Sequence, residues 1–152
     1  MPVIIDPALP AASLLKAENA VFLAPREKDA ELTMAFINLM PVKTDTERDF
    51  LRIIAPDRHT VDVKLVSMAS HKSRNTSAAP IGRFYTPFDR LPTLPDCVII
   101  TGAPLENVRF EDVDYWDEVT GIFETLRRNG IPTLYICWAA YAALYHFYGV
   151  AM

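Results

Sequence analysis

The chain has 152 residues, of which 51% are hydrophobic, so it can bury one core of ordinary size. Its 15 Lys and Arg stand against 19 Asp and Glu, which gives a formal net charge of −4. This balance argues against a dedicated nucleic-acid or membrane-surface protein, because such proteins present a basic face.

The cysteines and the apolar runs indicate a reducing cytoplasm. Cys97 and Cys137 lie in separate apolar runs, which is not the pattern of a secreted disulfide framework. Residues 1–6 lack the basic segment and the long apolar stretch of a signal peptide, and no apolar run is long enough to span a membrane. We therefore expect a cytoplasmic protein with no membrane or nucleic-acid partner.

The first half of the chain predicts two strands and a helix after an irregular start. Residues 1–30 contain four prolines and are expected to form an N-terminal arm, or a short strand and helix laid over the domain. The apolar run 32–39 predicts a buried strand. Residues 44–54 begin with N-capping side chains and continue with helical apolar spacing, which predicts a helix. The alternation over 60–68 predicts a strand near a sheet edge.

The second half predicts alternating strands and helices after a loop. Residues 70–93 are polar and contain prolines, so we expect a long functional loop with at most a short helix. The elements that follow are a strand over 96–101, a helix over 115–129 ended by Gly130, a strand over 133–136 and an Ala-rich helix over 138–147. This alternation implies a parallel sheet with helices on both faces.

A strand leads directly into a helix at Cys137. Such an elbow presents a nucleophile at the carboxyl edge of a sheet, where open α/β folds bind their ligands. The free N–H groups and dipole of the following helix favour a thiolate, and the N–H of Trp138 is placed to stabilise the oxyanion of an attacked thioester. The alternative is that Cys137 is a small buried hydrophobic residue, as many free cysteines are. The spacing alone favours neither interpretation.

A second loop, over 101–106, follows a strand and is expected at the same carboxyl edge. Gly102 permits a turn, and exposed backbone N–H groups in this loop are candidates to complete an oxyanion hole. An ordinary strand-ending turn explains the segment equally well. Cys97 lies inside a strand, so we expect it to have a structural role in the core.

None of the histidines is predicted to be the base for Cys137. His146 follows Cys137 on the same helix, about 13 Å along the axis and about half a turn round it, so it is expected at the surface or in packing. His59 is expected in an exposed turn and His71 in a solvated loop. The carboxylates of 111–118 precede or open a helix, where they suit its dipole, so a catalytic pair is not predicted. No metal-ligand spacing or glycine-rich phosphate loop is present.

Four blocks of residues, in order along nearly the whole chain, resemble the homoserine O-acyltransferase family. They are Asn38-Leu39-Met40-Pro41 with Lys43, Thr46 and Glu47; Ser70-His71 with Asn75-Thr76 and Phe84-Tyr85; Thr101-Gly102-Ala103-Pro104 with Tyr115-Trp116; and Cys137-Trp138-Ala139 with Ala142-Ala143-Leu144. The resemblance implies a flavodoxin-like α/β fold of the class I glutamine-amidotransferase type. It also implies acyl transfer from an acyl-CoA to the hydroxyl of L-homoserine, an early step of methionine biosynthesis, with no other cofactor.

The same resemblance implies roles for individual residues. Cys137 is expected to form an acyl-thioester, with backbone N–H groups near Leu105 and Trp138 holding the oxyanion and Lys43 in support. In the family, Glu at the position of Glu106 accompanies acetyl-CoA and Gly accompanies succinyl-CoA, which implies acetyl-CoA here. A carboxylate in the pocket would also repel the free carboxylate of a succinyl group.

The resemblance extends over half a family member. The family's proteins are about twice as long, as a complete doubly wound domain requires, and their catalytic His and Glu lie in the second half. We therefore interpret residues 31–152 as the N-terminal half of an α/β acyltransferase domain, and the chain as a fragment, one piece of a split protein or a shortened paralogue. Uncovered edge strands favour association with a second copy or with the missing half.

Other functions stay open from the sequence. One is a homoserine O-succinyltransferase that uses succinyl-CoA. Another is a non-catalytic binding or interaction module that has kept the half-fold, which the lack of a matching catalytic His and Glu favours. A third is another α/β protein with a cysteine at an elbow, such as a hydrolase or a stress protein.

Overall fold

The computed structural model describes residues 2–18, 22–24, 29–54, 59–71 and 82–151. The strands are β1 (Pro2–Ile4), β2 (Phe22–Ala24), β3 (Leu32–Ile37), β4 (Val61–Ser67), β5 (Tyr85–Pro87), β6 (Cys97–Ile100) and β7 (Thr133–Tyr135). The α-helices are α1 (Pro10–Ala17), α2 (Lys43–Ile54), α4 (Trp116–Arg128) and α5 (Trp138–Tyr148), and short 3-10 turns cover Phe88–Arg90 and Phe110–Asp112.

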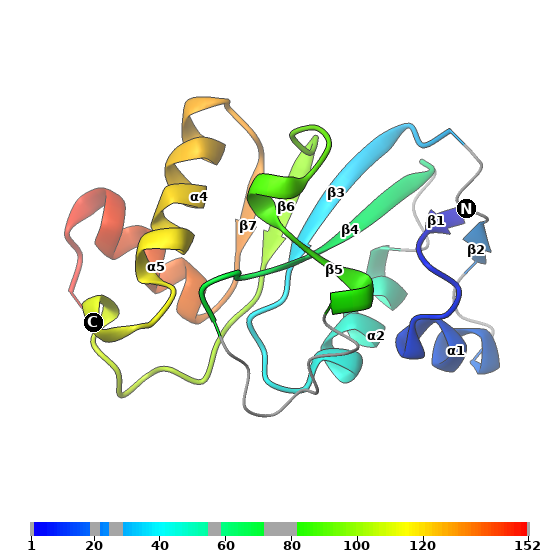
Figure 1. Cartoon of the computed structure of the whole chain (residues 1–152), viewed down its shortest axis with the longest axis horizontal. Coiled ribbons are helices and arrows are strands. Elements are labelled where there is room, and N and C mark those ends of the chain that lie inside the picture. The colour runs from blue at the N-terminus through cyan, green and yellow to red at the C-terminus, as the bar shows by residue number, and fades with distance from the viewer. Residues whose placement is uncertain (1, 19–21, 25–28, 55–58, 72–81, 152) are drawn as a thin grey trace.

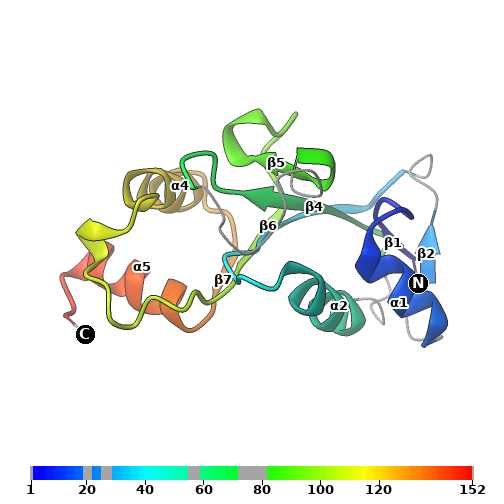
Figure 2. The same cartoon turned by 60° about the horizontal axis from the view of Figure 1, so that its bottom comes forward.

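The strands form one parallel sheet in the order β2-β1-β4-β3-β6-β7, with β5 pairing to β4 off this path. The run β4-β3-β6-β7 reproduces the first four positions of the flavodoxin-like order, which confirms the predicted α/β fold class. Helices α1 and α2 lie on one face of the sheet and α4 on the other (Figures 1 and 2). Helix α5 lies at the β7 end, on the side of α2 (Figure 2).

The two faces of the sheet bury separate apolar clusters. Phe36 of β3 is 1% exposed and its ring lies 5.0 Å from that of Phe50 on α2. Phe123 of α4 is fully buried in the cluster on the opposite face of the sheet. Ala35 and Ile37, the neighbours of Phe36 in β3, belong to the same cluster as Phe123. Alternate residues of one strand thus serve opposite faces, as a strand covered on both sides requires.

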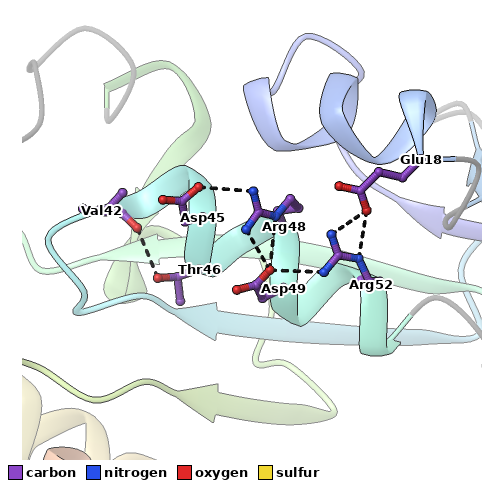
Figure 3. A network of polar contacts seen from close by, with 7 residues as sticks. All are labelled: Glu18, Val42, Asp45, Thr46, Arg48, Asp49 and Arg52. Carbon is purple, nitrogen blue, oxygen red and sulfur yellow. Dashed lines mark hydrogen bonds and ion pairs between the residues drawn. The ribbon is translucent and has the colours of Figure 1, made fainter.

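The N-terminal segment belongs to the sheet and to a helical layer. Strand β1 pairs with both β2 and β4, and the apolar face of α1 packs in the same buried cluster as Leu51 of α2. Figure 3 shows the polar side of this junction, where Arg52 of α2 donates from Nε to Glu18 Oε2 at 3.0 Å and binds Asp49 at 3.3 Å. These pairs are partly exposed and each contributes little stability, so apolar burial holds the segment in place.

Two predictions about the elements were wrong. The strand over 60–68 was expected near an edge, but β4 lies between β1 and β3 in the middle of the sheet. Its alternation arises because Val61, Val63 and Leu65 face the α1 and α2 cluster while Asp62 and Lys64 form an ion pair of 2.8 Å. The segment 70–93 was expected to hold no strand, but residues 85–87 pair with β4 as β5. Residues 72–81 lie outside the described part of the chain.

Candidate active site

Cys137 lies at a sharp elbow between β7 and α5. Its backbone has a φ of 49° and a ψ of −117°. Among the residues that the structure describes, Cys137 is the single non-glycine residue with a positive φ. Such a backbone costs about 1–3 kcal/mol and persists only where the surroundings enforce it. Here Ile136 N–H donates to Ile100 O at 3.0 Å, and Cys137 O accepts from Ala140 N–H at 3.0 Å. The strand before the elbow and the helix after it are therefore both anchored.

The thiol is exposed, which contradicts the alternative of a small buried hydrophobic residue. Cys97, expected in the core, is half-buried in β6, where burial raises the pKa of its thiol and Asp96 raises it further. The two cysteines thus differ in accessibility, and Cys137 is the one at the carboxyl edge of the sheet. This edge is where open α/β sheets bind ligands.

Gly102 comes from the adjacent strand end and lies directly against Cys137. A Cβ built on Gly102 would stand 3.1 Å from Cys137 Cβ and 3.9 Å from its Sγ. Thr101 fastens this loop, because its Oγ1 accepts from Leu39 N–H at 2.8 Å and donates to Gly102 O at 3.0 Å. A glycine at position 102 therefore allows the loop to approach Cys137 closely. An ordinary strand-ending turn would not need a glycine for this reason.

The predicted oxyanion donors differ in availability. Trp138 is the first residue of α5, and its backbone N–H has no acceptor within the described residues. The N–H of Leu105 donates to Ala103 O at 2.9 Å inside its own loop. An oxyanion role for Trp138 thus needs no rearrangement, whereas Leu105 has to exchange its present acceptor for the substrate oxygen.

A buried polar cluster lies beside this edge, at the start of α2. Lys43 Nζ donates to Asn38 O, and Asn38 Nδ2 donates to Tyr85 Oη at 3.2 Å. Tyr85 in turn donates to Glu47 Oε1, and Glu47 is only 2% exposed. Lys43 and Glu47 stand one helical turn apart on α2, so the cation and the carboxylate share one side of the helix.

Burial dominates the electrostatics of this cluster. It lowers the pKa of Lys43 to about 8, against the opposing effect of the Glu47 charge. It raises the pKa of Glu47, although the Tyr85 hydroxyl and Lys43 act in the other direction. The same burial, with the Glu47 carboxylate, raises the pKa of Tyr85, which therefore remains a hydrogen-bond donor. Lys43 also lines a small hollow of about 30 Å³ with His71, Asn38 and Tyr115 among its other lining residues.

The histidines contact carboxylates rather than Cys137. His59 Nδ1 lies 3.2 Å from Glu31, in the exposed turn that was predicted. His71 Nδ1 lies 2.9 Å from Asp114 and His146 Nε2 lies 2.8 Å from Glu124. No hydrogen bond joins a histidine of the described residues to Cys137.

Glu106 is exposed on the loop that carries Gly102. It lines an open hollow of about 410 Å³ together with Phe110, Tyr145 and five other residues. The loop begins at the end of β6 beside Cys137, so Glu106 lies on the same segment as Gly102, the residue that lies against Cys137.

Two absences hold for the part of the chain that the structure describes. No group of three or more His, Cys, Asp or Glu side chains there is arranged to hold a metal ion. None of the helices there is long and apolar enough to cross a membrane.

Tyr85 and Asn38 are site residues that reasoning from single motifs did not find. Both entered the sequence analysis only as members of family blocks. The spacing of Lys43 and Glu47 was a signal that could have indicated such partners. A charged pair buried on one side of a helix requires further polar groups nearby. The partner hydroxyl comes from β5, a strand that the sequence did not predict.

Comparison with known proteins finds one matching family model and several similar relatives. The family model described as homoserine O-succinyltransferase matches residues 2–152. Homoserine O-acetyltransferase of Bacteroides fragilis is 42% identical over 155 residues, covering 99% of this chain and 51% of the relative. Proteins of the same name from Phocaeicola vulgatus and Bacillus cereus are 42% and 43% identical, with 51% and 52% of the relative covered.

The chain therefore spans about half the length of the curated relatives it matches. The match runs over residues 2–152, a range that contains Cys137, Gly102 and the cluster around Lys43. On this evidence the chain belongs to the homoserine O-succinyltransferase family.

Proposed function

We propose that this chain contributes the nucleophile half of a homoserine O-acyltransferase, with Cys137 carrying the acyl group. The observation that carries the proposal is the exposed thiol on a strained elbow, at the N-terminus of α5 and against Gly102. The names of the family and of the relatives support homoserine as the acceptor and an acyl group as the group transferred, and we propose an acyl-CoA as the donor. No further cofactor enters the proposal.

The reaction proceeds in two halves. The Cys137 thiolate attacks the thioester carbonyl, a new C–S bond forms, and the CoA thiolate leaves with the electron pair of the broken C–S bond. The backbone N–H of Trp138, assisted by that of Leu105, stabilises the oxyanion of this step. The hydroxyl of homoserine then attacks the acyl-enzyme, a histidine base removes its proton, and the Cys137 thiolate is released. Lys43 supports the site from the start of α2.

Acetyl-CoA is the donor in this proposal. The relatives are named homoserine O-acetyltransferases, whereas the family model is named for succinyl transfer, so the name of the family does not choose the donor. Glu106 supports acetyl, because its carboxylate would repel the free carboxylate of a succinyl group. The free thiols of Cys97 and Cys137 suit a reducing cytoplasm, where we place the reaction.

Intact-protein mass spectrometry after incubation with acetyl-CoA or succinyl-CoA tests the proposal. We expect an acetyl adduct on the wild type, its loss in Cys137→Ala and its retention in Cys97→Ala, the matched control for the other thiol. A succinyl adduct in its place would overturn the donor assignment and keep the nucleophile. In Glu106→Gly we expect succinyl adduct formation to rise relative to acetyl. An adduct that survives Cys137→Ala would refute the nucleophile.

A binding module is the second candidate function. The observation that favours it is the pairing of the histidines with Glu31, Asp114 and Glu124 rather than with the thiol. Slow alkylation of Cys137 at neutral pH, at the rate of an ordinary exposed cysteine, together with no adduct from either donor, would select this candidate.

A further inference from the structure

Thr101 is a buried threonine whose hydroxyl joins the carboxyl ends of two neighbouring strands. It directly follows β6 and is 1% exposed. Its Oγ1 accepts from Leu39 N–H, just beyond β3, at 2.8 Å and donates to Gly102 O at 3.0 Å. Strands β3 and β6 lie side by side in the sheet, so this hydroxyl connects the two loops that leave them (Figure 1).

The bond from Thr101 holds the residue that lies against the thiol. A Cβ built on Gly102 would stand 3.1 Å from Cys137 Cβ, so a small movement of this backbone changes the surroundings of the nucleophile. Among the described residues, no other hydrogen bond holds Gly102. The position of Gly102 relative to Cys137 therefore depends on the Thr101 hydroxyl.

The peptide that donates to Thr101 is held from its other side by Lys43. The Nζ of Lys43 donates to Asn38 O, and the carbonyl of Asn38 and the N–H of Leu39 belong to one planar peptide unit. A cation on the carbonyl polarises this unit and strengthens its N–H as a donor. Lys43 thus acts on the Thr101 hydroxyl through a rigid group.

We propose that Thr101 is a positioning residue for acyl transfer at Cys137, and that it couples Lys43 to the loop that begins at Gly102. The proposal rests on the proposed function, because it needs Cys137 to be the nucleophile. The path runs from Lys43 through the 38–39 peptide to the Thr101 hydroxyl, and from this hydroxyl to the Gly102 carbonyl. Lys43 in this arrangement supports the site without touching the substrate.

The loop needs such an anchor because its backbone donors have to meet the thioester oxygen while the thiol attacks the carbonyl carbon. The N–H of Leu105 must first leave Ala103 O, its present acceptor at 2.9 Å. A loop that rearranges at Leu105 keeps its register with Cys137 only if its first residue stays fixed. Misplacing reacting groups by about 1 Å costs about 100-fold in rate, so the loss falls on the acylation step rather than on donor binding.

The rate of acetyl adduct formation on Cys137, followed by intact-protein mass spectrometry over a range of acetyl-CoA concentrations, tests the proposal. Thr101→Val keeps the shape and removes the hydroxyl, so we expect the limiting rate to fall about 10- to 100-fold, while the concentration for half-maximal rate changes by less than about threefold. Thr101→Ser keeps the hydroxyl and should stay within about threefold of the wild-type limiting rate.

Two controls separate positioning from stability. Thr120→Val removes another buried hydroxyl, which donates to Trp116 O at 2.9 Å inside α4, and should leave the adduct rate unchanged. Cys97 lies in β6 with Thr101 close behind it, so its labelling by iodoacetamide reports opening of this strand and should not change in Thr101→Val. The double variant Lys43→Met with Thr101→Val should be less than additive in rate, since both changes act on one path.

Each result decides the proposal. Equal losses in Thr101→Val and Thr101→Ser, or faster labelling of Cys97 in Thr101→Val, would reduce Thr101 to a structural role and overturn it. Additive effects of the two changes in the double variant would overturn the link to Lys43. An adduct that forms equally fast in wild type and Thr101→Val would overturn the positioning role alone, whereas no adduct on the wild type would overturn the proposed function and this role with it.

Discussion

Removing the hydroxyl of Tyr85 tests whether the buried cluster at the carboxyl edge is a connected unit. In Tyr85→Phe the Glu47 carboxylate loses its hydroxyl donor and Asn38 Nδ2 loses an acceptor at 3.2 Å. Glu47 and Tyr85 are 2% and 7% exposed, so water cannot replace the lost partner without a rearrangement. A hydrogen bond to a charged group contributes about 1.5–3 kcal/mol, and we expect Tyr85→Phe to lower the free energy of unfolding by about 2–3 kcal/mol.

The pH dependence of this loss follows from the sign of the Glu47 shift. The folded pKa of Glu47 is raised above its ordinary value, so its stability contribution is fully present below pH 4.5 and is lost as the pH rises through the folded pKa. The Tyr85 hydroxyl opposes this rise, so removing it raises the pKa further and increases the loss at neutral pH. The difference between wild type and Tyr85→Phe should therefore be larger at pH 8 than at pH 5.

Urea unfolding followed by circular dichroism at both pH values measures this difference. Tyr141→Phe is the matched control, because Tyr141 is 56% exposed, and it should change the free energy of unfolding by less than about 0.5 kcal/mol. The double variant with Glu47→Gln should be less than additive, since both changes act on one hydrogen bond. Equal effects of the two tyrosine substitutions, or a loss that does not change between pH 5 and pH 8, would refute the reasoning.

Three further predictions concern the elbow and the lysine. Gly102→Ala brings a Cβ to 3.1 Å from that of Cys137, so alkylation of the thiol by iodoacetamide should slow several-fold, while the free energy of unfolding changes by less than about 1 kcal/mol. An unchanged alkylation rate would contradict the close approach. The free energy of unfolding of Cys137→Gly, measured in urea, should exceed that of Cys137→Ala by about 1 kcal/mol, because glycine adopts a φ of 49° without strain. The opposite order would contradict a strained elbow. Burial lowers the folded pKa of Lys43 from 10.5 to about 8, so its contribution is present above pH 10.5 and lost as the pH falls through about 8. Lys43→Met should therefore flatten the rise of unfolding free energy between pH 8 and pH 10, and a curve parallel to wild type would contradict this.

The sequence by itself predicted the local elements and the elbow cysteine that we propose as the nucleophile. Apolar periodicity, capping residues and Gly130 are local signals, and they predicted the strand over 96–101 and the helix over 115–129. The elbow at Cys137 was also predictable, because a strand-to-helix turn is formed by residues that are neighbours in the sequence. Family blocks added the acyltransferase assignment, which the comparisons support through the match over residues 2–152.

Only the tertiary structure decided which residues meet across the sheet. The central place of β4 depends on pairing with β1 and β3, and alternation in one strand carries no information about its neighbours. The contact between Gly102 and Cys137 and the bond from Tyr85 to Glu47 join segments that are 35 and 38 positions apart. The position of β7 in the strand order likewise depends on tertiary pairing, because a short apolar strand has the same local pattern whether or not another strand lies beside it.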